Sequence, residues 1–420
     1  MSRASLGADA PLILIDDAIF GAESLFASLR RGALASARIV LRPGAGLDVD
    51  DAEAAADLAV AQAIVVRTMS PIDAELLSRA PALRFVGSAS AGYDHVDLDA
   101  LAAAGIAFAH SPGCNARAVA EWVVAALVDA AIRSDAPPAL ARWARDADAP
   151  LRVGIVGCGA VGSQLRSYLE AMGVQLHLCD PLVAERGELP EHEPLETLLA
   201  ASDVISFHTS LSRSGRWPSH GLISAPRLRA LLADGKTIVN ASRGEVLELP
   251  EARSLVADDP PGALILDVWP GEPRPPAAWI DPATRPSRLF RATPHIAGYS
   301  YEGKLRATTL VAGALAEHFE VPGVSALEAR ALALLPPPSA RRGRTLEDEV
   351  QEVAAFGRDD ADLRSVPREA DGRLASAGYR QLRRGYAFRR EWAAHQAQSP
   401  WSEASAFPAL AARLRRAMEA

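Results

Sequence analysis

The sequence predicts an α/β fold of parallel, doubly wound sheets, and two observations lead to this prediction. The first is a glycine-rich turn, V-G-I-V-G-C-G-A-V-G at 153–162, between an apolar run and a helix-like stretch at Ser163–Gly173. The second is the alternation of short apolar runs with helix-like stretches before this turn. Such alternation is typical of parallel sheets, because each crossover needs a helix to return the chain. With 420 residues, the chain is expected to form two or three domains.

The glycine-rich turn has the pattern of a dinucleotide-binding fingerprint. Gly157 allows a tight turn, Gly159 lets the backbone approach a pyrophosphate, and Gly162 lets helix and strand pack closely. The N–H groups at the start of the helix face the phosphate charge. Asp180 ends the next apolar run, where its carboxylate can accept hydrogen bonds from a ribose and repel a 2′-phosphate. A lone G-x-G-x-x-G is often only a turn, but with strand, helix and acid in register the pattern predicts NAD as cofactor.

Composition and charge exclude several classes of protein. Hydrophobic residues make up 49% of the chain, enough for sizeable cores, and the net charge of −8 argues against a nucleic-acid partner. The three cysteines, Cys114, Cys158 and Cys179, show neither a disulfide framework nor metal-ligand spacing, which indicates a reducing cytoplasm and no metal site. The chain has no signal-like start, and no apolar run is long enough to span a membrane.

Four strands are expected before the fingerprint, at Pro11–Ile15, Ala37–Leu41, Ala61–Arg67 and Leu83–Gly87. Ligands bind at the carboxyl edge of such sheets, so residues at or just past strand ends are candidates for substrate contact. These candidates are Arg67, Thr68, Ser90, Ala91 and Gly92. For Ser90–Gly92, a plain surface turn is an equally good interpretation.

Three later strand ends carry side chains that suit hydride-transfer chemistry. A long apolar helix is expected at Ala116–Arg133, a mobile polar loop at Leu211–Gly221, and strands at Ala201–Ser206, Lys236–Ser242, Ala263–Val268 and Leu289–Thr293. The last three strands lead to Arg243, Glu272 and His295. Parallel strands share one carboxyl edge, so the three side chains can converge.

Oxidation of an alcohol by a nicotinamide needs a base, a group that orients the base, and a cation for the substrate. Histidine suits the first role because its pKa lies near neutrality, and a carboxylate beside it fixes its tautomer. Arginine matches a substrate carboxylate bidentately. Singly, each residue has an ordinary alternative as a solvated charge, a turn residue or a structural histidine. Together they favour His295 as base, Glu272 as its partner and Arg243 as the carboxylate ligand.

The composition changes after Pro336 to charge-rich sequence and then to Y-R-Q-L-R-R-G-Y-A-F-R-R-E-W. Tyr379, Leu382, Tyr386 and Trp392 have roughly helical spacing. We interpret this segment as a small appended domain. A disordered basic tail is the alternative, which the aromatic residues weaken.

The motifs N-A-S-R-G (240–244), L-D-V-W-P-G-E-P (266–273) and P-H-I-A-G-Y (294–299) resemble the D-isomer-specific 2-hydroxyacid dehydrogenase family. The resemblance implies a Rossmann-type NAD domain at 116–295, inserted in a split, flavodoxin-like substrate domain at 1–115 and 296–330. Residues 331–420 are similar to a small α+β dimerisation domain, which implies a homodimer. The run H-I-A-G-Y-S-Y-E-G-K (295–304) resembles the branch that oxidises 4-phospho-D-erythronate to (R)-3-hydroxy-2-oxo-4-phosphooxybutanoate in pyridoxal phosphate biosynthesis.

The resemblance also implies roles for single residues. The catalytic residues are Arg243, Glu272 and His295. NAD contacts are expected from Gly157, Gly159, Ala160, Val161, Gly162, Asp180, Thr209, Ala241, Ser242, Arg243, Asp267 and Gly298. Substrate contacts are expected from Thr68, Ser90 and Tyr299, and Arg67 is our candidate for the phosphate, unless it caps its own sheet and Tyr299 only packs. Pro270 stands where an acid is commoner in the family, and the Leu211–Gly221 loop is longer than usual.

Two alternatives to this function stay open from the sequence. One is a dehydrogenase of another D-2-hydroxy acid, such as glycerate, 3-phosphoglycerate or lactate. The other is a regulator that senses NAD with the same fold and lacks turnover, against which the intact set of Arg243, Glu272 and His295 argues.

Overall fold

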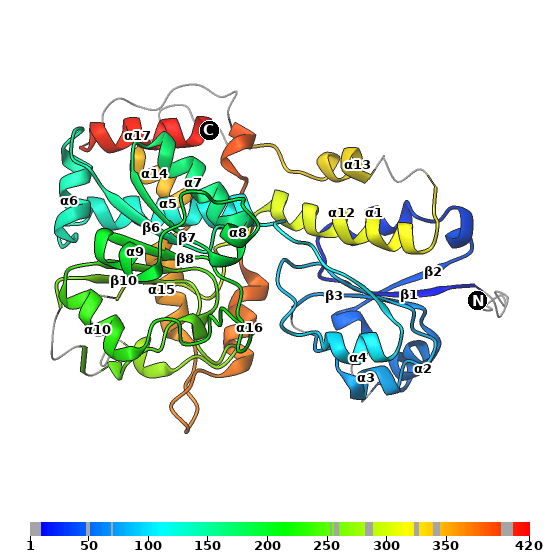
Figure 1. Cartoon of the computed structure of the whole chain (residues 1–420). Coiled ribbons are helices and arrows are strands. Elements are labelled where there is room, and N and C mark those ends of the chain that lie inside the picture. Colours follow the sequence, from blue (N-terminus) through cyan, green and yellow to red (C-terminus); the bar gives the residue numbers. More distant parts are fainter. Residues whose placement is uncertain are drawn as a thin grey trace. The chain divides into compact units, whose positions relative to one another are not determined.

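The computed structural model describes residues 10–47, 51–68, 70–252, 254–255, 260–281, 289–322, 327–338, 345–395 and 406–420. The chain forms two compact units, and each is discontinuous in sequence (Figure 1). Unit 1 comprises Met1–Asn115 and Tyr301–Pro337, and unit 2 comprises Ala116–Ser300 and Pro338–Ala420. None of the described helices is long and apolar enough to cross a membrane.

Unit 1 is built on a sheet of five parallel strands in the order β2-β1-β3-β4-β5. The strands are β1 (Leu12–Asp16), β2 (Arg38–Arg42), β3 (Ala63–Val66), β4 (Phe85–Ser88) and β5 (Ala107–Ala109). The helices are α1 (Ala22–Ala27), α2 (Ala52–Val60), α3 (Ala74–Ser78), α4 (Leu98–Ala103), α12 (Tyr301–His318) and α13 (Leu327–Ala333). This strand order is flavodoxin-like, as expected. The first four strands were predicted from the sequence, and β5 was not.

Helices cover both faces of the unit 1 sheet. Helices α1, α12 and α13 lie on one face and α2, α3 and α4 on the other (Figure 1). Strands β1, β3 and β4 are therefore buried along their whole length, which explains their continuous apolar sequences. A Cβ on Gly87 would lie 2.5 Å from Cγ1 of Val311, so β4 and α12 pack this closely because Gly87 has no side chain.

Unit 2 is built on six parallel strands in the order β11-β10-β9-β8-β6-β7. The strands are β6 (Arg152–Val156), β7 (Gln175–Cys179), β8 (Val204–Phe207), β9 (Thr237–Asn240), β10 (Ala263–Leu266) and β11 (Leu289–Ala292). The order is that of a Rossmann-type sheet from which the third strand of the first half is missing. At that place a single bridge joins Leu178 to His192. The predicted α/β class and Rossmann-type sheet are confirmed.

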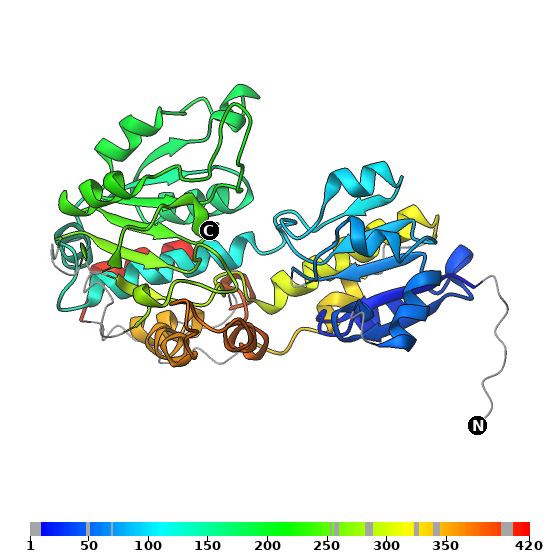
Figure 2. The ribbon, with the colours of Figure 1, turned by 90° about the horizontal axis from the view of Figure 1, so that it is seen from below.

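Helices from both ends of unit 2 complete its core. These are α5 (Ala116–Ile132), α6 (Pro138–Arg145), α7 (Ala160–Ala171), α8 (Pro181–Glu185), α9 (Leu195–Ala201), α10 (Ala225–Ala233), α14 (Leu346–Val353), α15 (Phe356–Ser365), α16 (Ser376–Gly385) and α17 (Pro408–Glu419). Helix α14 contacts α5, α17 contacts α7, and α15 contacts the edge strand β11. In Figure 2 the C-terminal helices, orange to red, lie against the rest of unit 2.

The C-terminal segment differs in two respects from the appended α+β domain that we expected. Its apolar residues share the cores of the rest of unit 2: Phe356 and Trp392 belong to one buried cluster, and Leu363 and Tyr379 to another. Its described regular elements are helices, with β-structure only at isolated bridges such as the one between Arg368 and Leu374. The aromatic and aliphatic residues of the C-terminal helices therefore fill cores that they share with the rest of unit 2, and do not form a core of their own.

Candidate active site

The glycine-rich loop between β6 and α7 has the close packing that only glycine permits. Gly157 has a φ of +94°, and a Cβ there would lie 2.7 Å from the carbonyl carbon of His208. A Cβ on Gly162 would lie 2.0 Å from the carbonyl oxygen of Gly157. By contrast, a Cβ on Gly159 would meet no described atom within 4 Å. The loop therefore packs tightly on its strand side and is open where a pyrophosphate is predicted.

Asp180 supports this loop from the end of β7. Its Oδ2 accepts a hydrogen bond from the N–H of Cys158 (2.8 Å), and its Oδ1 accepts one from the N–H of Val183 (3.1 Å) at the start of α8. Each carboxylate oxygen has two lone pairs, so both can also accept from a ribose hydroxyl. Asp180 thus positions the loop in addition to its predicted cofactor role.

A buried hydroxyl next to the loop lacks a partner. Oγ1 of Thr209 is buried and has no hydrogen-bond partner among the described residues. Its neighbour His208 lies 2.8 Å, through Nε2, from Oγ of Ser206, and desolvation lowers the pKa of His208 to about 3, so the ring stays neutral. An unsatisfied buried hydroxyl is costly, and a ligand can satisfy it. Together with the open face at Gly159, this hydroxyl fits a bound dinucleotide.

The Leu211–Gly221 loop contacts the helix that follows Asp180. Nε1 of Trp217 donates to Oε1 of Glu185 in α8 (3.0 Å), and Nη1 of Arg216 lies 2.9 Å from the same oxygen. The Arg216 guanidinium also lies 5.2 Å from the Trp217 ring centroid. In this arrangement the loop reaches across to the side of the sheet where the adenosine half of NAD is expected. Its mobility stays a prediction.

His295 and Glu272 form a hydrogen-bonded pair. His295 Nδ1 lies 2.7 Å from Glu272 Oε2, and Glu272 Oε1 accepts from the N–H of Trp269 (2.8 Å). Burial acts to raise the pKa of Glu272, but the charges of His295 and Arg383 and these hydrogen bonds outweigh it and hold the pKa below its ordinary value. The ionised carboxylate assigns a proton to Nδ1, so Nε2 is the nitrogen left for a substrate. The His295 side chain is 31% exposed, and thus accessible.

The backbone of His295 is held in a strained conformation. Its φ of +59° lies in the left-handed region, which costs a non-glycine residue on the order of 1–3 kcal/mol. Asp267, fully buried, holds the loop: its carbonyl oxygen accepts from the N–H of His295 (2.7 Å). Its carboxylate accepts from Oγ1 of Thr293 (2.6 Å) and from the N–H groups of Ile296 (2.8 Å) and Ala297 (2.9 Å). Asp267 therefore fixes the direction in which His295 points, and its predicted NAD contact stays a prediction.

Arg243 follows β9 on a loop that touches the loop of Glu272. The Nδ2 of Asn240 donates to the carbonyl oxygen of Arg243 (2.9 Å) and holds the turn. A Cβ on Gly244 would lie 1.9 Å from the carbonyl carbon of Trp269, so the two loops are in direct backbone contact. Of the three predicted catalytic residues, two form a direct pair and the third lies on an adjoining loop.

Two of the predicted substrate residues of unit 1, Arg67 and Ser90, have hydrogen-bond partners within the unit. Arg67 binds Asp16 through two contacts, Nε to Oδ2 (2.7 Å) and Nη2 to Oδ1 (3.3 Å). This is the alternative in which Arg67 caps its own sheet. Thr68 is exposed, and the Ser90 hydroxyl donates to the carbonyl oxygen of Gly92 (2.8 Å).

Residues that the sequence analysis did not assign to the site come from the C-terminal segment. The Tyr299 ring packs edge-to-face against Tyr386 and Phe388, with centroids 5.9 and 6.0 Å apart. Nη1 of Arg383 lies 3.9 Å from Oε2 of Glu272. The spacing of Tyr and Arg in Y-R-Q-L-R-R-G-Y was the available signal, but it does not reveal which loop the helix meets.

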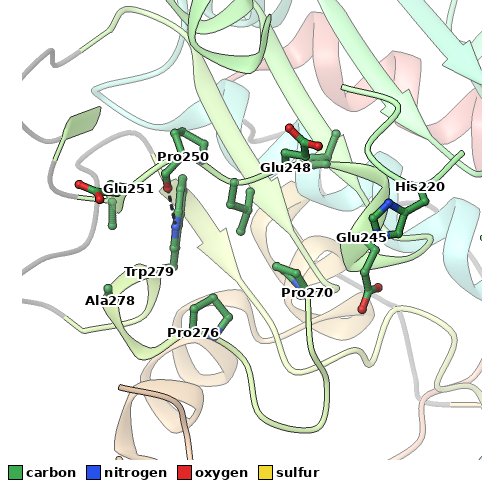
Figure 3. A pocket seen from close by; sticks show the side chains of 12 residues that line it. His220, Glu245, Glu248, Pro250, Glu251, Pro270, Pro276, Ala278 and Trp279 are labelled. Carbon is green, nitrogen blue, oxygen red and sulfur yellow. Dashed lines mark hydrogen bonds between the residues drawn. The ribbon is translucent and has the colours of Figure 1, made fainter. Parts of the chain in front are cut away.

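The site differs from a cavity that the structure also contains. This cavity, about 540 Å³, lies between the 245–252 segment and Pro270–Trp279, and Glu245, Glu248 and Trp279 are among its lining (Figure 3). Nε1 of Trp279 donates to the carbonyl oxygen of Pro250 (3.1 Å) in its wall. None of the described residues lining this cavity is a predicted site residue. The candidate site is therefore defined by the contacts between its side chains and not by this cavity. Within the described residues, no group of three His, Cys, Asp or Glu side chains could hold a metal ion.

Comparison with known sequences gives matches along most of the chain. The family model described as D-isomer specific 2-hydroxyacid dehydrogenase, catalytic domain, matches residues 30–406. A protein of Sodalis glossinidius named erythronate-4-phosphate dehydrogenase is 37% identical over 395 residues, which are 90% of this chain and 92% of that protein. A protein of the same name from Teredinibacter turnerae is 36% identical over 400 residues, 92% of this chain and 95% of its own.

Solved structures share the fold. The NAD+-bound 3-phosphoglycerate dehydrogenase of Entamoeba histolytica has a TM-score of 0.58 at 20% identity, covering 75% of this chain and 97% of its own. The TT0316 protein of Thermus thermophilus has a TM-score of 0.56 at 26% identity, covering 74% and 99%. These structures share the arrangement of parallel sheets, and a quarter of the present chain lies outside the match.

Proposed function

Since the chain belongs to the D-isomer specific 2-hydroxyacid dehydrogenase family, we propose that it is an NAD-dependent dehydrogenase that oxidises 4-phospho-D-erythronate at its 2-hydroxyl group. The product is (R)-3-hydroxy-2-oxo-4-phosphooxybutanoate, in pyridoxal phosphate biosynthesis. The observation that carries the reaction type is the contact between Nδ1 of His295 and Oε2 of Glu272, in the unit whose sheet also carries the glycine-rich loop at 157–162. The names of relatives about 36% identical over nine-tenths of the chain support the substrate.

The residues of this chain supply binding and proton transfer. Nε2 of His295 takes the proton of the 2-hydroxyl group, and the charge that forms on the imidazole is stabilised by Glu272. Arg243 offers a planar fork for the substrate carboxylate. NAD, when bound, accepts the hydride from the same carbon. The loop at Gly159 and the hydroxyl of Thr209 would hold it, with Asp180 on the ribose.

A phosphorylated substrate carries a second anionic end, which needs donors of its own. In unit 1, Arg67 keeps Nη1 outside its two contacts with Asp16, and the hydroxyl of Thr68 is exposed. Both therefore remain candidates, with Ser90 and Tyr299, for the substrate. We also propose a cytoplasmic homodimer, on the family resemblance of the C-terminal segment and on three buried free cysteines.

The test is an NADH absorbance assay with 4-phospho-D-erythronate beside erythronate, D-glycerate, 3-phosphoglycerate and D-lactate. We expect the highest kcat/KM for 4-phospho-D-erythronate. His295→Ala should lower kcat roughly 10²–10⁴-fold, the contribution of a positioned general base, while NADH binding persists. Turnover of another acid with a higher kcat/KM would overturn the substrate, and NADH binding without turnover of any would favour a regulator. Light scattering checks the dimer.

A further inference from the structure

Helix α16 presents two side chains to the acid of the candidate active site. Tyr379 and Arg383 are four residues apart, so they lie on one face of the helix. Arg383 Nη1 lies 3.9 Å from Oε2 of Glu272, and its side chain is only 13% exposed. Tyr379 is fully buried. A helix from the far C-terminal segment thus packs behind the pair of Glu272 and His295.

Both side chains have hydrogen-bonding capacity to spare. In the part of the chain that the structure describes, the Tyr379 hydroxyl and Nε of Arg383 are buried and neither makes a hydrogen bond of normal geometry, although the hydroxyl lies close enough to Glu272 to interact with it. Burial, followed by the charge of Glu272, raises the pKa of Tyr379 well above its ordinary value, so the phenol stays a neutral donor. A guanidinium is not deprotonated in proteins, so Arg383 stays a cation. Glu272 is therefore faced by a neutral donor and a positive charge.

The charges around Glu272 come from separate segments of the chain. The titratable and charged groups that interact with Glu272 or Arg383 are His295, Tyr379, Tyr299 and Asp267. Burial raises the pKa of Glu272, and the nearby cations more than compensate. Arg383 is one of these cations. It lies in helix α16, which is remote in sequence from the loops of Glu272 and His295.

We propose that Arg383 and Tyr379 are positioning residues that keep the Glu272 carboxylate ionised and turned toward His295. This inference rests on the function proposed above, in which His295 is the base and Glu272 orients it. Like charges repel, so Arg383 also acts against a second positive charge on the imidazole of His295. A segment expected only to join two subunits then takes part in proton transfer.

The test compares Arg383→Met, Arg383→Lys and, as matched control, Arg384→Met, an exposed arginine of the same helix. For alcohol oxidation, the acidic limb of the pH profile of kcat/KM reports the base. Arg383→Met should move this limb to higher pH by about half to one unit, a modest interaction of one charge through the protein. At pH values on this limb, kcat/KM should fall by about 3–10-fold. Arg383→Lys retains the charge, so its acidic limb should lie close to that of the wild type. Arg384→Met should have the same pH profile as the wild type.

A second measurement separates this proposal from the proposed function. The pKa of His295, measured by NMR titration with its signal assigned through His295→Gln, needs no turnover. A higher His295 pKa in Arg383→Met supports the positioning role even if 4-phospho-D-erythronate is not the substrate. An unchanged pKa in folded Arg383→Met overturns the role, as does a rise in KM for the phosphorylated substrate alone, which would make Arg383 a substrate ligand. If Arg383→Met does not fold, Tyr379→Phe must show a smaller shift in the same direction, and no shift refutes the proposal.

Discussion

The pair of Arg67 and Asp16 offers a decisive test of whether a predicted substrate residue serves the fold. Asp16 is fully buried at the end of β1, and Arg67, 24% exposed, follows β3, the neighbouring strand. Besides the two guanidinium contacts, the carboxylate accepts one N–H, from Ala18 (3.0 Å). Arg67→Ala would therefore leave a buried carboxylate with a single donor. Breaking a buried pair costs about 3–5 kcal/mol, and the partial exposure of Arg67 lowers our expectation to about 2–4 kcal/mol.

The assay must report on unit 1 alone. All seven tryptophans lie outside the two stretches that form unit 1, so tryptophan fluorescence does not follow it. Hydrogen exchange of peptides from β1 and β3, read by mass spectrometry, does. A loss of 2–4 kcal/mol accelerates exchange of its most protected amides roughly 30- to 700-fold. Asp16→Asn combined with Arg67→Ala should lose much less than the sum of the single changes, because the unpaired charge is gone.

Two measurements on Arg67→Ala separate a structural role of Arg67 from a phosphate-binding role. If Arg67→Ala leaves exchange in β1 and β3 unchanged and raises KM for 4-phospho-D-erythronate but not for erythronate, Arg67 is a phosphate ligand. The pair with Asp16 would then contribute little to the fold. If exchange accelerates and KM rises equally for both substrates, Arg67 stabilises the fold through its contacts with Asp16 and is not a phosphate ligand.

Three further changes test the rest of the molecule. Asp180→Ala should weaken NAD binding by about 1.5–3 kcal/mol, the range for hydrogen bonds to a charged group, and reduce the preference of the protein for NAD over NADP. Fluorescence titration with both cofactors measures these affinities. An unchanged preference would mean that another residue contacts the ribose. Deletion of 338–420 should yield an unfolded or insoluble chain, since Trp392 and Tyr379 belong to shared cores; a folded, NAD-binding product in circular dichroism and titration would contradict that. Burial raises the pKa of Asp359 to about 6, although Tyr386 donates to it (2.9 Å), so the native state favours the protonated acid. The stabilisation from this raised pKa is fully present below about pH 4 and is lost as pH rises through 6. Between pH 4 and 7 the free energy of unfolding of Asp359→Asn should therefore rise relative to that of the wild type by about 1–3 kcal/mol. A difference in thermal stability that does not change with pH over this range would contradict this prediction.

The parts of the fold that follow local rules could be predicted from the sequence. Buried parallel strands such as β3 and β4 are continuous apolar runs, and glycines 157, 159 and 162 mark one turn by spacing alone. Strand β5 has only three residues and is half-buried, so it lacks this signal. The direct contact of His295 with Glu272 follows from strand ends sharing an edge.

Other features depend on contacts between distant segments, which spacing does not encode. Arg67 and Asp16 are 51 positions apart, and the sequence shows only that each stands at a strand end. The helix that carries Arg383 looks like a basic, aromatic surface helix, because its partner Glu272 lies more than a hundred residues earlier. For the same reason, the C-terminal apolar residues predicted a separate domain, although they complete cores begun by α5 and β6.

The threading of the chain through its two units has a consequence for synthesis on the ribosome. The sheet of unit 1 is complete at β5, but one of its faces waits for helix α12, whose Leu305, Val311 and Leu315 lie in the same buried cluster as β1. Between Asn115 and Tyr301 the ribosome adds 300 − 115 = 185 residues. At about 5–20 residues per second, this takes roughly 10–40 s. During that time only α1 is available to cover this face of β1, β3 and β4, so we expect the nascent first sheet to bind holding chaperones.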